Sequence, residues 1–244
     1  MRSDKKFFGK SSSLPVDKFF LNVLYDKEYG YYNKKEPFGS NGDYITAPKI
    51  SFLFSDIIAI WLISTWENFG KPKHFNIVEL GPGDGSLTKN ILKVFKNFPN
   101  FNNSKKIFLY EISNFLTKVQ KKKLKNNKVK WIKDFNEIKK GPVIFFGNEF
   151  FDAIPIKQFK RDNGLLLEKY FFIDKNFRIY ERFKKANKRD TKNIENFKSL
   201  DNLKFIEYPK LGLEELKKIV KKVTILKGGI LLIDYGYLKP NNQN

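Results

Sequence analysis

The sequence of 244 residues contains no cysteine, one histidine and one methionine. The lack of cysteine excludes disulfides, thiolate nucleophiles and zinc or iron–sulfur centres with cysteine ligands. The single histidine, His74, cannot build a histidine-rich metal site or a relay that needs two imidazoles. Any chemistry must therefore rest on carboxylates, hydroxyls, amides, lysines or a bound cofactor, and we expect no metal site.

The sequence also lacks a run of about 20 apolar residues, the length that a membrane-spanning helix needs. The longest apolar stretch, residues 50–66, is interrupted by serines, a threonine and Asp56. The N-terminus carries basic residues but leads into serines and a proline, so no secretory signal is evident. With 41% hydrophobic and 16% aromatic residues the chain is too apolar to be disordered. These features predict a globular, cytoplasmic protein without a membrane span.

Acidic residues and arginine are scarce compared with lysine. The formal net charge is +21, and 42 lysines face only five arginines. A charge of this size is typical of proteins that bind nucleic acid or an anionic surface. Phosphate recognition, however, favours the bidentate fork of arginine, and asparagine, isoleucine and phenylalanine are also abundant. A compositional bias therefore explains the charge better than nucleic-acid binding does. The sequence contains no internal repeat, and it does not predict an oligomeric state.

Short apolar runs alternate with helical spacers from residue 75 onward. The runs cover residues 75–80, 107–111, 129–132 and 143–147, with helices expected near 86–98 and 114–124. Alternation of this kind is typical of right-handed crossovers and a parallel sheet. The sequence therefore predicts an α/β fold.

Helices are also expected on either side of this region. Helices over residues 14–26 and 48–69 would form an N-terminal cap, residues 1–72, with a loop that covers the cofactor. Residues 73–244 would form the main domain, with an insertion at about 157–210 that contains a β-hairpin of residues 165–173 and 178–183. Residues 186–203 are polar and predict a mobile loop. A helix over 213–226 would lead into a last strand at 230–234.

A glycine-rich turn follows the first of these strands. Gly81, Gly83 and Gly85 alternate with Pro82 and Asp84 before the next helix begins at Ser86. Glycines at this place allow a tight turn and a close approach of a ligand to the free N–H groups of the helix. The spacing G-x-G-x-G differs from that of dinucleotide dehydrogenases. The turn predicts a nucleotide-type cofactor site, and an ordinary strand–helix turn remains the alternative.

Acidic residues follow the next two predicted strands. Glu111 ends the second run, where its carboxylate could accept both hydroxyl groups of a ribose. Asp134 follows the third run, where it could accept a hydrogen bond from the amino group of an adenine. A role for Asp134 as a helix cap or a solvated turn residue is equally open.

Polar residues also follow the fourth predicted strand. Asn148, Glu149 and Asp152 are interleaved with Phe150 and Phe151, which we expect in the core or in a cleft wall. Because ligands of open α/β sheets lie beyond the carboxyl ends of the strands, these polar residues should face the same crevice as the glycine turn. They are difficult to explain by packing alone, since buried polar groups without partners are costly.

Several of these motifs together resemble the MidA family of S-adenosylmethionine-dependent methyltransferases. The resemblance spans residues 14–236 and rests on Leu24-Tyr25, residues 30–32, residues 37–51 with the sequence G-D-Y-I-T-A-P-K-I-S, the cofactor turn at 78–85, N-E-F-F-D-A-I-P at 148–155, and residues 228–236. It implies a Rossmann-like class I methyltransferase sheet that binds S-adenosyl-L-methionine. Mitochondrial members of the family are complex I assembly factors that methylate protein arginine.

The sequence departs from the family pattern at Asp84, where the family usually has arginine, and at Lys49, where it usually has glutamate. Family members also continue well past the motif at 234–236. The resemblance therefore implies that the closing antiparallel strands are missing and that the strand at 230–234 lies at or near an exposed edge.

The resemblance implies a role for each candidate residue. Glu79, Gly81, Gly83, Gly85, Glu111 and Asp134 would bind the cofactor, and Asp43 and Thr46 would close over its methionine end, although a turn or cap role is equally open for these two. Glu149 and Asp152 would hold a substrate guanidinium, with Asn148 as an orienting amide. The expected substrate is protein arginine, for instance in a respiratory complex I subunit. A catalytically silent assembly or scaffold protein and a nucleic-acid methyltransferase are the alternatives.

Overall fold

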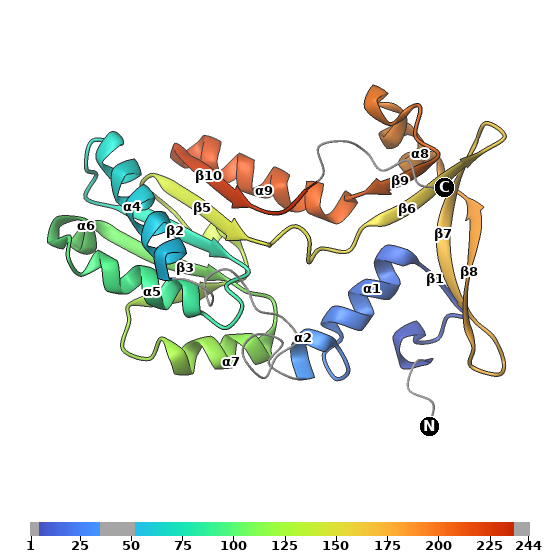
Figure 1. The fold of residues 1–244 in the computed structure, drawn as a ribbon, viewed down its shortest axis with the longest axis horizontal. Coiled ribbons are helices and arrows are strands. Elements are labelled where there is room, and N and C mark those ends of the chain that lie inside the picture. Colours follow the sequence, from blue (N-terminus) through green and yellow to red (C-terminus); the bar gives the residue numbers. More distant parts are fainter. Residues whose placement is uncertain (1–4, 35–51, 237–244) are drawn as a thin grey trace. The chain divides into compact units, whose positions relative to one another are not determined.

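The computed structural model describes residues 5–34 and 52–236, which form two compact units. The first, the parallel unit, comprises Tyr31–Phe150 and Leu216–Asp234. The second, the antiparallel unit, comprises Met1–Gly30, Phe151–Glu215 and Tyr235–Asn244. Figure 1 traces the chain through both units, each of which contains one of the two five-stranded sheets. Each unit is described by itself.

The parallel unit contains one sheet with the strand order β10-β5-β2-β3-β4, in which every neighbouring pair is parallel. Its strands are β2 (Phe75–Leu80), β3 (Lys105–Tyr110), β4 (Val129–Ile132), β5 (Val143–Asn148) and β10 (Gly228–Ile233). Its helices are α2 (Tyr31–Lys34), α4 (Phe52–Asn68), α5 (Ser86–Phe95), α6 (Pro99–Ser104), α7 (Asn114–Lys123), η2 (Phe135–Glu137) and most of α9 (Lys210–Leu226).

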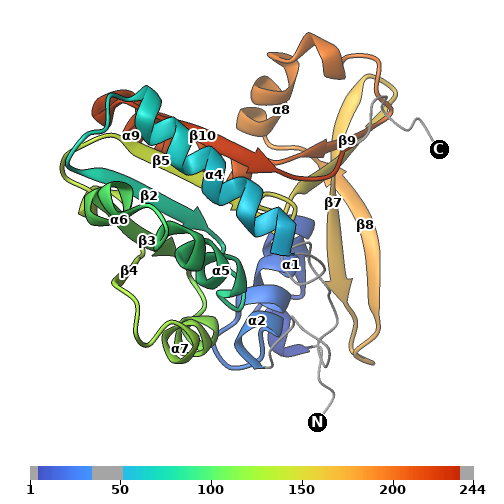
Figure 2. The ribbon, with the colours of Figure 1, turned by 60° about the vertical axis from the view of Figure 1, so that its left-hand side comes forward.

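The sheet is built outward from β2, its central strand. All six residues of β2 are buried, as expected for a parallel strand that is covered on both faces. From β2 the chain moves to β3 and β4 on one side, and later to β5 and β10 on the other. Right-handed crossovers in opposite directions place their helices on opposite faces of a sheet. Figure 2 shows α4 and α5 on one of these faces.

The core of the parallel unit lies between that face and helices α4 and α5. It contains side chains from α4, α5, α6 and alternate positions of the strands. Phe101 of α6 contacts both Trp66 and Phe95, with ring centroids 5.4 and 4.7 Å apart. Burial of these large rings contributes about 1.5–3 kcal/mol for each side chain and supplies most of the stability of this layer.

The antiparallel unit contains the other sheet, with the order β1-β7-β6-β9 and with β8 paired to β7. Its strands are β1 (Ser13–Pro15), β6 (Lys157–Asp162), β7 (Leu165–Ile173), β8 (Ile179–Lys185) and β9 (Phe205–Tyr208). Its helices are η1 (Lys5–Phe8), α1 (Val16–Tyr25), α8 (Lys188–Glu195), η3 (Lys198–Leu200) and the first residues of α9. Phe159, Ile194 and Ile206 are at the centre of its core.

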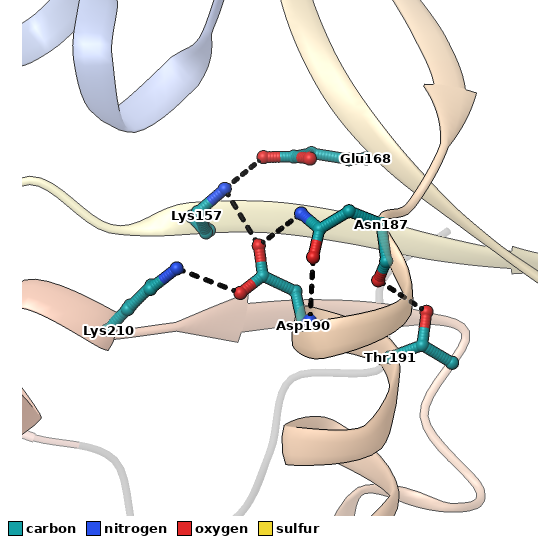
Figure 3. Close-up of polar contacts among 6 residues, drawn as sticks. All are labelled: Lys157, Glu168, Asn187, Asp190, Thr191 and Lys210. Carbon is teal, nitrogen blue, oxygen red and sulfur yellow. Dashed lines mark hydrogen bonds and ion pairs between the residues drawn. The ribbon is translucent and has the colours of Figure 1, made fainter.

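Charged side chains are buried beside this small core (Figure 3). Lys157 of β6 forms ion pairs with Glu168 of β7 and with Asp190 of α8, the second over 3.0 Å. Asp190 also accepts a hydrogen bond from Lys210, 3.0 Å away, at the start of α9. Burial lowers the pKa of Lys157, but its hydrogen bonds to Glu168 and Asp190 and the charge of Asp17 outweigh burial and raise this pKa to about 12. This buried charge cluster joins two strands and two helices of the unit.

The predicted strands of the parallel sheet are confirmed. Residues 75–80 and 129–132 coincide with β2 and β4, and β10 starts two residues earlier than predicted. Within the described residues β10 pairs only with β5, so it lies at an edge of the sheet.

Three other expectations differ from the structure. Residues 186–203, predicted as a mobile loop, contain α8 and η3, which are anchored because Asp190 and Ile194 are fully buried. The predicted hairpin, β7 and β8, is part of a five-stranded sheet, because β1, β6 and β9 also pair in it. The predicted cap is divided: α1 belongs to the antiparallel unit, whereas α4 packs on α5 in the parallel unit.

The part of the chain that the structure describes has no helix that is long and apolar enough to cross a membrane. Across these same residues, no group of three or more histidine, aspartate and glutamate side chains could hold a metal ion.

Candidate functional site

The turn after β2 is shaped by its three glycines. Gly81, Gly83 and Gly85 all have positive φ, at 59°, 54° and 79°, a conformation that other residues rarely adopt. A Cβ atom on Gly81 would lie 2.9 Å from Cδ2 of Phe150, closer than side chains pack. Gly85 is the N-cap of α5 and has no side chain to cap it, and of the first N–H groups of the helix that of Ser86 is bonded to Asp84. The turn therefore combines close backbone approach with a helix N-terminus, as an anionic or nucleotide ligand requires.

Two carboxylates stabilise the turn from within. Glu79 in β2 is 3% exposed and accepts a hydrogen bond from the hydroxyl of Thr88 in α5. Burial raises the pKa of Glu79 to about 7, the charge of Asp84 adds to this effect, and the Thr88 hydrogen bond opposes it. Asp84 accepts a hydrogen bond from the backbone N–H of Ser86 over 2.9 Å and pairs with Lys123 over 2.7 Å. Asp84, the departure from the family pattern, thus ties the turn to α5 and α7.

Glu111 is held beside this turn by a glutamine that the sequence analysis did not identify. Its carboxylate accepts hydrogen bonds from the N–H of Ser113, over 2.7 Å, and from Nε2 of Gln120, over 3.0 Å. Gln120 also donates to the carbonyl oxygen of Gly83 over 2.8 Å and accepts from Nε1 of Trp131. Gln120 is fully buried in α7, and it connects the glycine turn directly to Glu111.

Burial raises the pKa of Glu111, and its hydrogen bonds to Ser113 and Gln120 oppose this rise. Each carboxylate oxygen carries two lone pairs, so both oxygens can accept a further hydrogen bond from a ligand. The spacing of Leu116 and Gln120, four residues apart on one face of a helix, was the signal that could have revealed Gln120 as a buried amide.

The segment before α4 also reaches this part of the unit. Ser113 caps α7 by accepting from the N–H of Leu116, and its hydroxyl donates to the carbonyl oxygen of Tyr32 over 2.8 Å. Tyr32 belongs to α2, in the G-Y-Y stretch of the family resemblance. The stretch therefore lies next to Glu111, a contact that the sequence did not predict.

Asp134 follows β4 as predicted, but its side chain caps the short helix η2. Its Oδ1 accepts a hydrogen bond from the N–H of Asn136 over 2.8 Å, and its side chain is exposed. The sequence left two roles open for Asp134. In the structure it caps η2, and its contact with an adenine stays a prediction.

Asn148 and Glu149 lie at the carboxyl end of β5, the strand next to β2. Asn148 is the last residue of β5, and the N–H of Glu149 donates to the carbonyl oxygen of Ile233 over 2.8 Å. Glu149 is exposed and has a φ of 49°, which is uncommon for a residue other than glycine and is concentrated at functional sites. The ring of Phe150 then packs against Gly81 and lies 6.3 Å from the ring of Tyr110.

Asp152 belongs to the antiparallel unit and is exposed. Within that unit, the hydroxyl of Tyr25 donates to the carbonyl oxygen of Ala153 over 3.1 Å, so α1 holds the segment that carries Asp152. Asp43 and Thr46 lie outside the residues that the structure describes, and their predicted roles stay predictions.

The parallel unit therefore brings together most of the predicted residues. The glycine turn follows β2, Glu111 follows β3, and Asn148 and Glu149 follow β5, all at the carboxyl edge of the sheet. β2 and β5 are the neighbouring strands at which the strand order reverses, the place where open α/β sheets bind ligands. The glycine cradle, the helix N-terminus and the acid on the neighbouring strand fit a nucleotide-type cofactor.

Comparison with known sequences supports this assignment. The profile of a family of S-adenosyl-L-methionine-dependent methyltransferases matches residues 57–244. The mitochondrial protein arginine methyltransferase NDUFAF7 of Xenopus laevis is 26% identical over 92% of this chain and 57% of its own length. The human protein of the same name is 28% identical, over 92% of this chain and 56% of its own length. The chain thus spans just over half the length of these relatives.

Comparison with solved structures supports the fold. A Burkholderia thailandensis protein crystallised with S-adenosyl-homocysteine superimposes with a TM-score of 0.78 at 19% identity, over 96% of this chain and 61% of that one. Native crystals of a Burkholderia thailandensis protein give a TM-score of 0.75. At this identity the likeness shows the fold, a Rossmann-like methyltransferase sheet.

The relatives also correct one prediction. The cytoplasmic location expected from the sequence is contradicted, because the similar NDUFAF7 proteins are named as mitochondrial. The resemblance read from the motifs, in contrast, is confirmed by the family profile, which covers more than half of the chain. The chain belongs to the family of S-adenosyl-L-methionine-dependent methyltransferases.

Proposed function

We propose that this protein transfers the methyl group of S-adenosyl-L-methionine to an arginine side chain of a protein substrate. The observation that carries the proposal is the connection of the glycine turn to Glu111 through the buried amide of Gln120. This arrangement presents backbone groups and a carboxylate at the switch point of a parallel sheet. The names of the similar NDUFAF7 proteins support arginine as the acceptor.

Each residue of the parallel unit has a role in this proposal. The backbone of Gly81, Gly83 and Gly85 binds the cofactor closely, and Glu111 accepts the ribose hydroxyls. Glu79 holds the turn against α5 through Thr88. Gln120 orients Glu111, since the amide fixes one of its two oxygens. Asp134 stays a candidate for the adenine amino group, in addition to its role as a cap.

The acceptor would be held at the end of β5. When bound, the cofactor would supply a sulfonium methyl group: the bond from this methyl to sulfur would break as its bond to the acceptor nitrogen forms, the neutral thioether would depart, and the nitrogen would release one proton to solvent. The chain has to position the attacking nitrogen and exclude water, which are the main protein contributions to such a step. An arginine is protonated at neutral pH, so the carboxylate of Glu149 holds it by charge-assisted hydrogen bonds and draws its charge away from the attacking nitrogen. Asn148 orients the guanidinium, and Asp152 is the second candidate carboxylate.

The family resemblance extends the proposal to the substrate. The mitochondrial members of the MidA family are complex I assembly factors, so a subunit of that complex is the substrate we propose.

The test is methyl transfer by the purified chain. Radiolabelled S-adenosyl-L-methionine is incubated with the protein and with recombinant complex I subunits, and cofactor affinity is measured separately by calorimetry. We expect label on arginine. Glu149→Gln should bind the cofactor as the wild type does but transfer the methyl group at least about 10-fold more slowly, the scale of a lost positioning contact. Gly83→Val should lose cofactor binding.

The two measurements separate the alternatives. Absence of cofactor binding in the wild type would contradict the proposed site. Cofactor binding without transfer, under conditions in which a full-length relative methylates the same subunits, would favour a silent assembly protein. An equal loss of binding and transfer in Glu149→Gln would assign Glu149 to folding.

A further inference from the structure

Lysines gather at the edge of the parallel sheet that lies opposite the candidate site. The N-terminal ends of parallel strands share one edge, and each strand of this sheet begins at a lysine or within three residues after an exposed lysine. We call this row the lysine edge; it consists of Lys73 before β2, Lys105 and Lys106 in β3, Lys125 and Lys128 before β4, Lys139 and Lys140 before β5, and Lys227 before β10.

The strand register places the first residues of the strands at nearly one level. Lys105 is paired with Phe75, the first residue of β2, and Val129 of β4 is paired with Ile107 of β3. Gly228 of β10 is paired with Val143, the first residue of β5. Neighbouring strands are about 5 Å apart, so the starts of the strands, with the lysines at or shortly before them, share one edge of the sheet.

Most lysines of this row have no acidic partner among the residues that the structure describes. In residues 5–34 and 52–236, Lys73, Lys106, Lys128, Lys140 and Lys227 form no ion pair. Two nearby acids are engaged elsewhere, Glu67 with Lys71 over 3.0 Å and Glu137 with Lys130 over 2.9 Å. Burial, and then repulsion from Lys128, lowers the pKa of Lys105 to about 8. The lysine edge therefore has a surplus of positive charge that can attract an anionic partner.

Helix termini account for only part of the row. Lysines near the last turn of a helix offset the partial negative charge of its carbonyl groups. Lys125 and Lys227 follow α7 and α9, and Lys105 is the C-cap of α6. Lys73, Lys106 and Lys140, however, do not follow a helix directly, so the helix dipole does not explain them.

The kind of cation and its apolar neighbours indicate the partner. All five arginines of the chain lie outside the parallel unit, so its excess charge comes entirely from lysine. Lysine acts as a point charge, which suits diffuse attraction to a flat anionic surface better than bidentate reading of phosphates. Phe69, 38% exposed, lies at this edge with its ring 6.1 Å from that of Phe75, and Phe98, 37% exposed, ends the turn after α5. Exposed aromatic rings among lysines are typical of surfaces that lie on a bilayer.

We propose that the lysine edge docks the protein on an anionic lipid bilayer, with Phe69 and Phe98 entering the interface. Docking at this edge leaves the carboxyl edge of the sheet, with its glycine turn, on the opposite side of the parallel unit and facing away from the lipid. The inference does not depend on the proposed methyl transfer.

The experiment measures co-sedimentation of the purified chain with phosphatidylcholine vesicles, with and without phosphatidylglycerol. The edge variant combines Lys73→Glu, Lys106→Glu and Lys140→Glu. A matched control with the same change of net charge combines Lys118→Glu on α7 with Lys217→Glu and Lys221→Glu on α9, all exposed. Circular dichroism and thermal unfolding establish that both variants are folded.

We expect the wild type to bind only the vesicles that contain phosphatidylglycerol and to be released by high salt. The edge variant should bind them at least about 100-fold more weakly, given the contribution of each lysine near an anionic surface, while the control keeps most of its affinity. Failure of the wild type to sediment, or equal weakening of the two variants, would overturn the proposal. Tighter binding to single-stranded RNA that depends on the same three lysines, without binding to vesicles, would assign the edge to nucleic acid instead.

Discussion

Gln120 shows how much a single buried amide contributes to the candidate site. Its side chain forms three hydrogen bonds, to Gly83, Glu111 and Trp131, and so connects the glycine turn to Glu111 after the neighbouring strand. An amide at this position satisfies a carbonyl, a carboxylate and an indole at once, and no apolar residue could do so. The geometry of the site thus depends on a residue outside every motif.

Glu111 is the first residue to test. Glu111→Ala should weaken the affinity for S-adenosyl-L-methionine by about 1–3 kcal/mol, the scale of hydrogen bonds to a charged group. The measurement is isothermal calorimetry at neutral pH. Glu137→Ala, which removes an exposed carboxylate paired with Lys130, is the control and should leave affinity unchanged. A change of less than a few tenths of a kcal/mol in the Glu111 variant would remove this residue from the site.

Glu79 predicts a pH dependence of stability. Because the folded-state pKa, about 7, lies above the ordinary value of 4.5, the folded state holds a proton that the unfolded state releases first. Stability should therefore fall as the pH rises from about 4.5 to 7, by on the order of 3 kcal/mol, and then level off.

Glu79→Gln should remove this dependence, because glutamine does not titrate. The test is urea unfolding of both proteins at several pH values. As the pH rises from about 4.5 to 7, the unfolding free energy of the wild type should fall relative to that of the variant. A constant difference from pH 5 to 8 would show that Glu79 titrates at an ordinary pKa.

At the scale of elements, the buried charge cluster holds the antiparallel unit together. Lys157 lies between Glu168 and Asp190 and is 7% exposed, so β6, β7 and α8 share one cation. One oxygen of the buried Asp17, at the start of α1, has no hydrogen-bond partner, which leaves it dependent on nearby positive charge. The segment that was predicted as a loop contains α8, and the ion pairs of Asp190 with Lys157 and Lys210 anchor this helix.

Removing the cation should therefore be costly. Lys157→Met leaves Glu168 buried without its cation and removes one of the two lysines that pair with Asp190, and we expect a loss of about 3–5 kcal/mol in the free energy of unfolding. Lys160→Met in the same strand removes an exposed pair with Asp162 and should cost roughly 0–1 kcal/mol. Chemical denaturation followed by far-ultraviolet circular dichroism compares the two. Similar losses in both variants would mean that the cluster contributes no more than a surface pair.

At the scale of the whole molecule, the net charge of +21 opposes folding by self-repulsion. Salt screens charges over distances beyond about 10 Å at 0.1 M. The melting temperature should therefore rise by about 2–4 °C between low and moderate sodium chloride concentration. A gain of roughly 1 kcal/mol in the free energy of unfolding produces a shift of this size in a protein of this length. The Lys118, Lys217 and Lys221 variant carries less positive charge and should respond less. A melting temperature that is constant or falls with salt would contradict this expectation.

The parallel sheet was largely predictable from the sequence. The run 143–147 is apolar throughout, and the run 75–80 has only Asn76 and Glu79 as polar residues, because both faces are covered; this local pattern identifies buried parallel strands. The short strands β1 and β9 were not predicted, because their pairing is set by strands distant in the chain.

Local chemistry by itself determined the glycine turn, the acid after the second strand and the family, since each depends on residues that are close together in the sequence. Tertiary structure alone decided three other features: Gln120 as the link between turn and acid, Lys157 as a shared buried cation, and the division of the N-terminal helices between two units. The physical reason is that burial and hydrogen bonding join residues from distant segments. Helical spacing can indicate that a polar side chain such as Gln120 is buried, but the sequence does not show which partners the folded chain will bring to it.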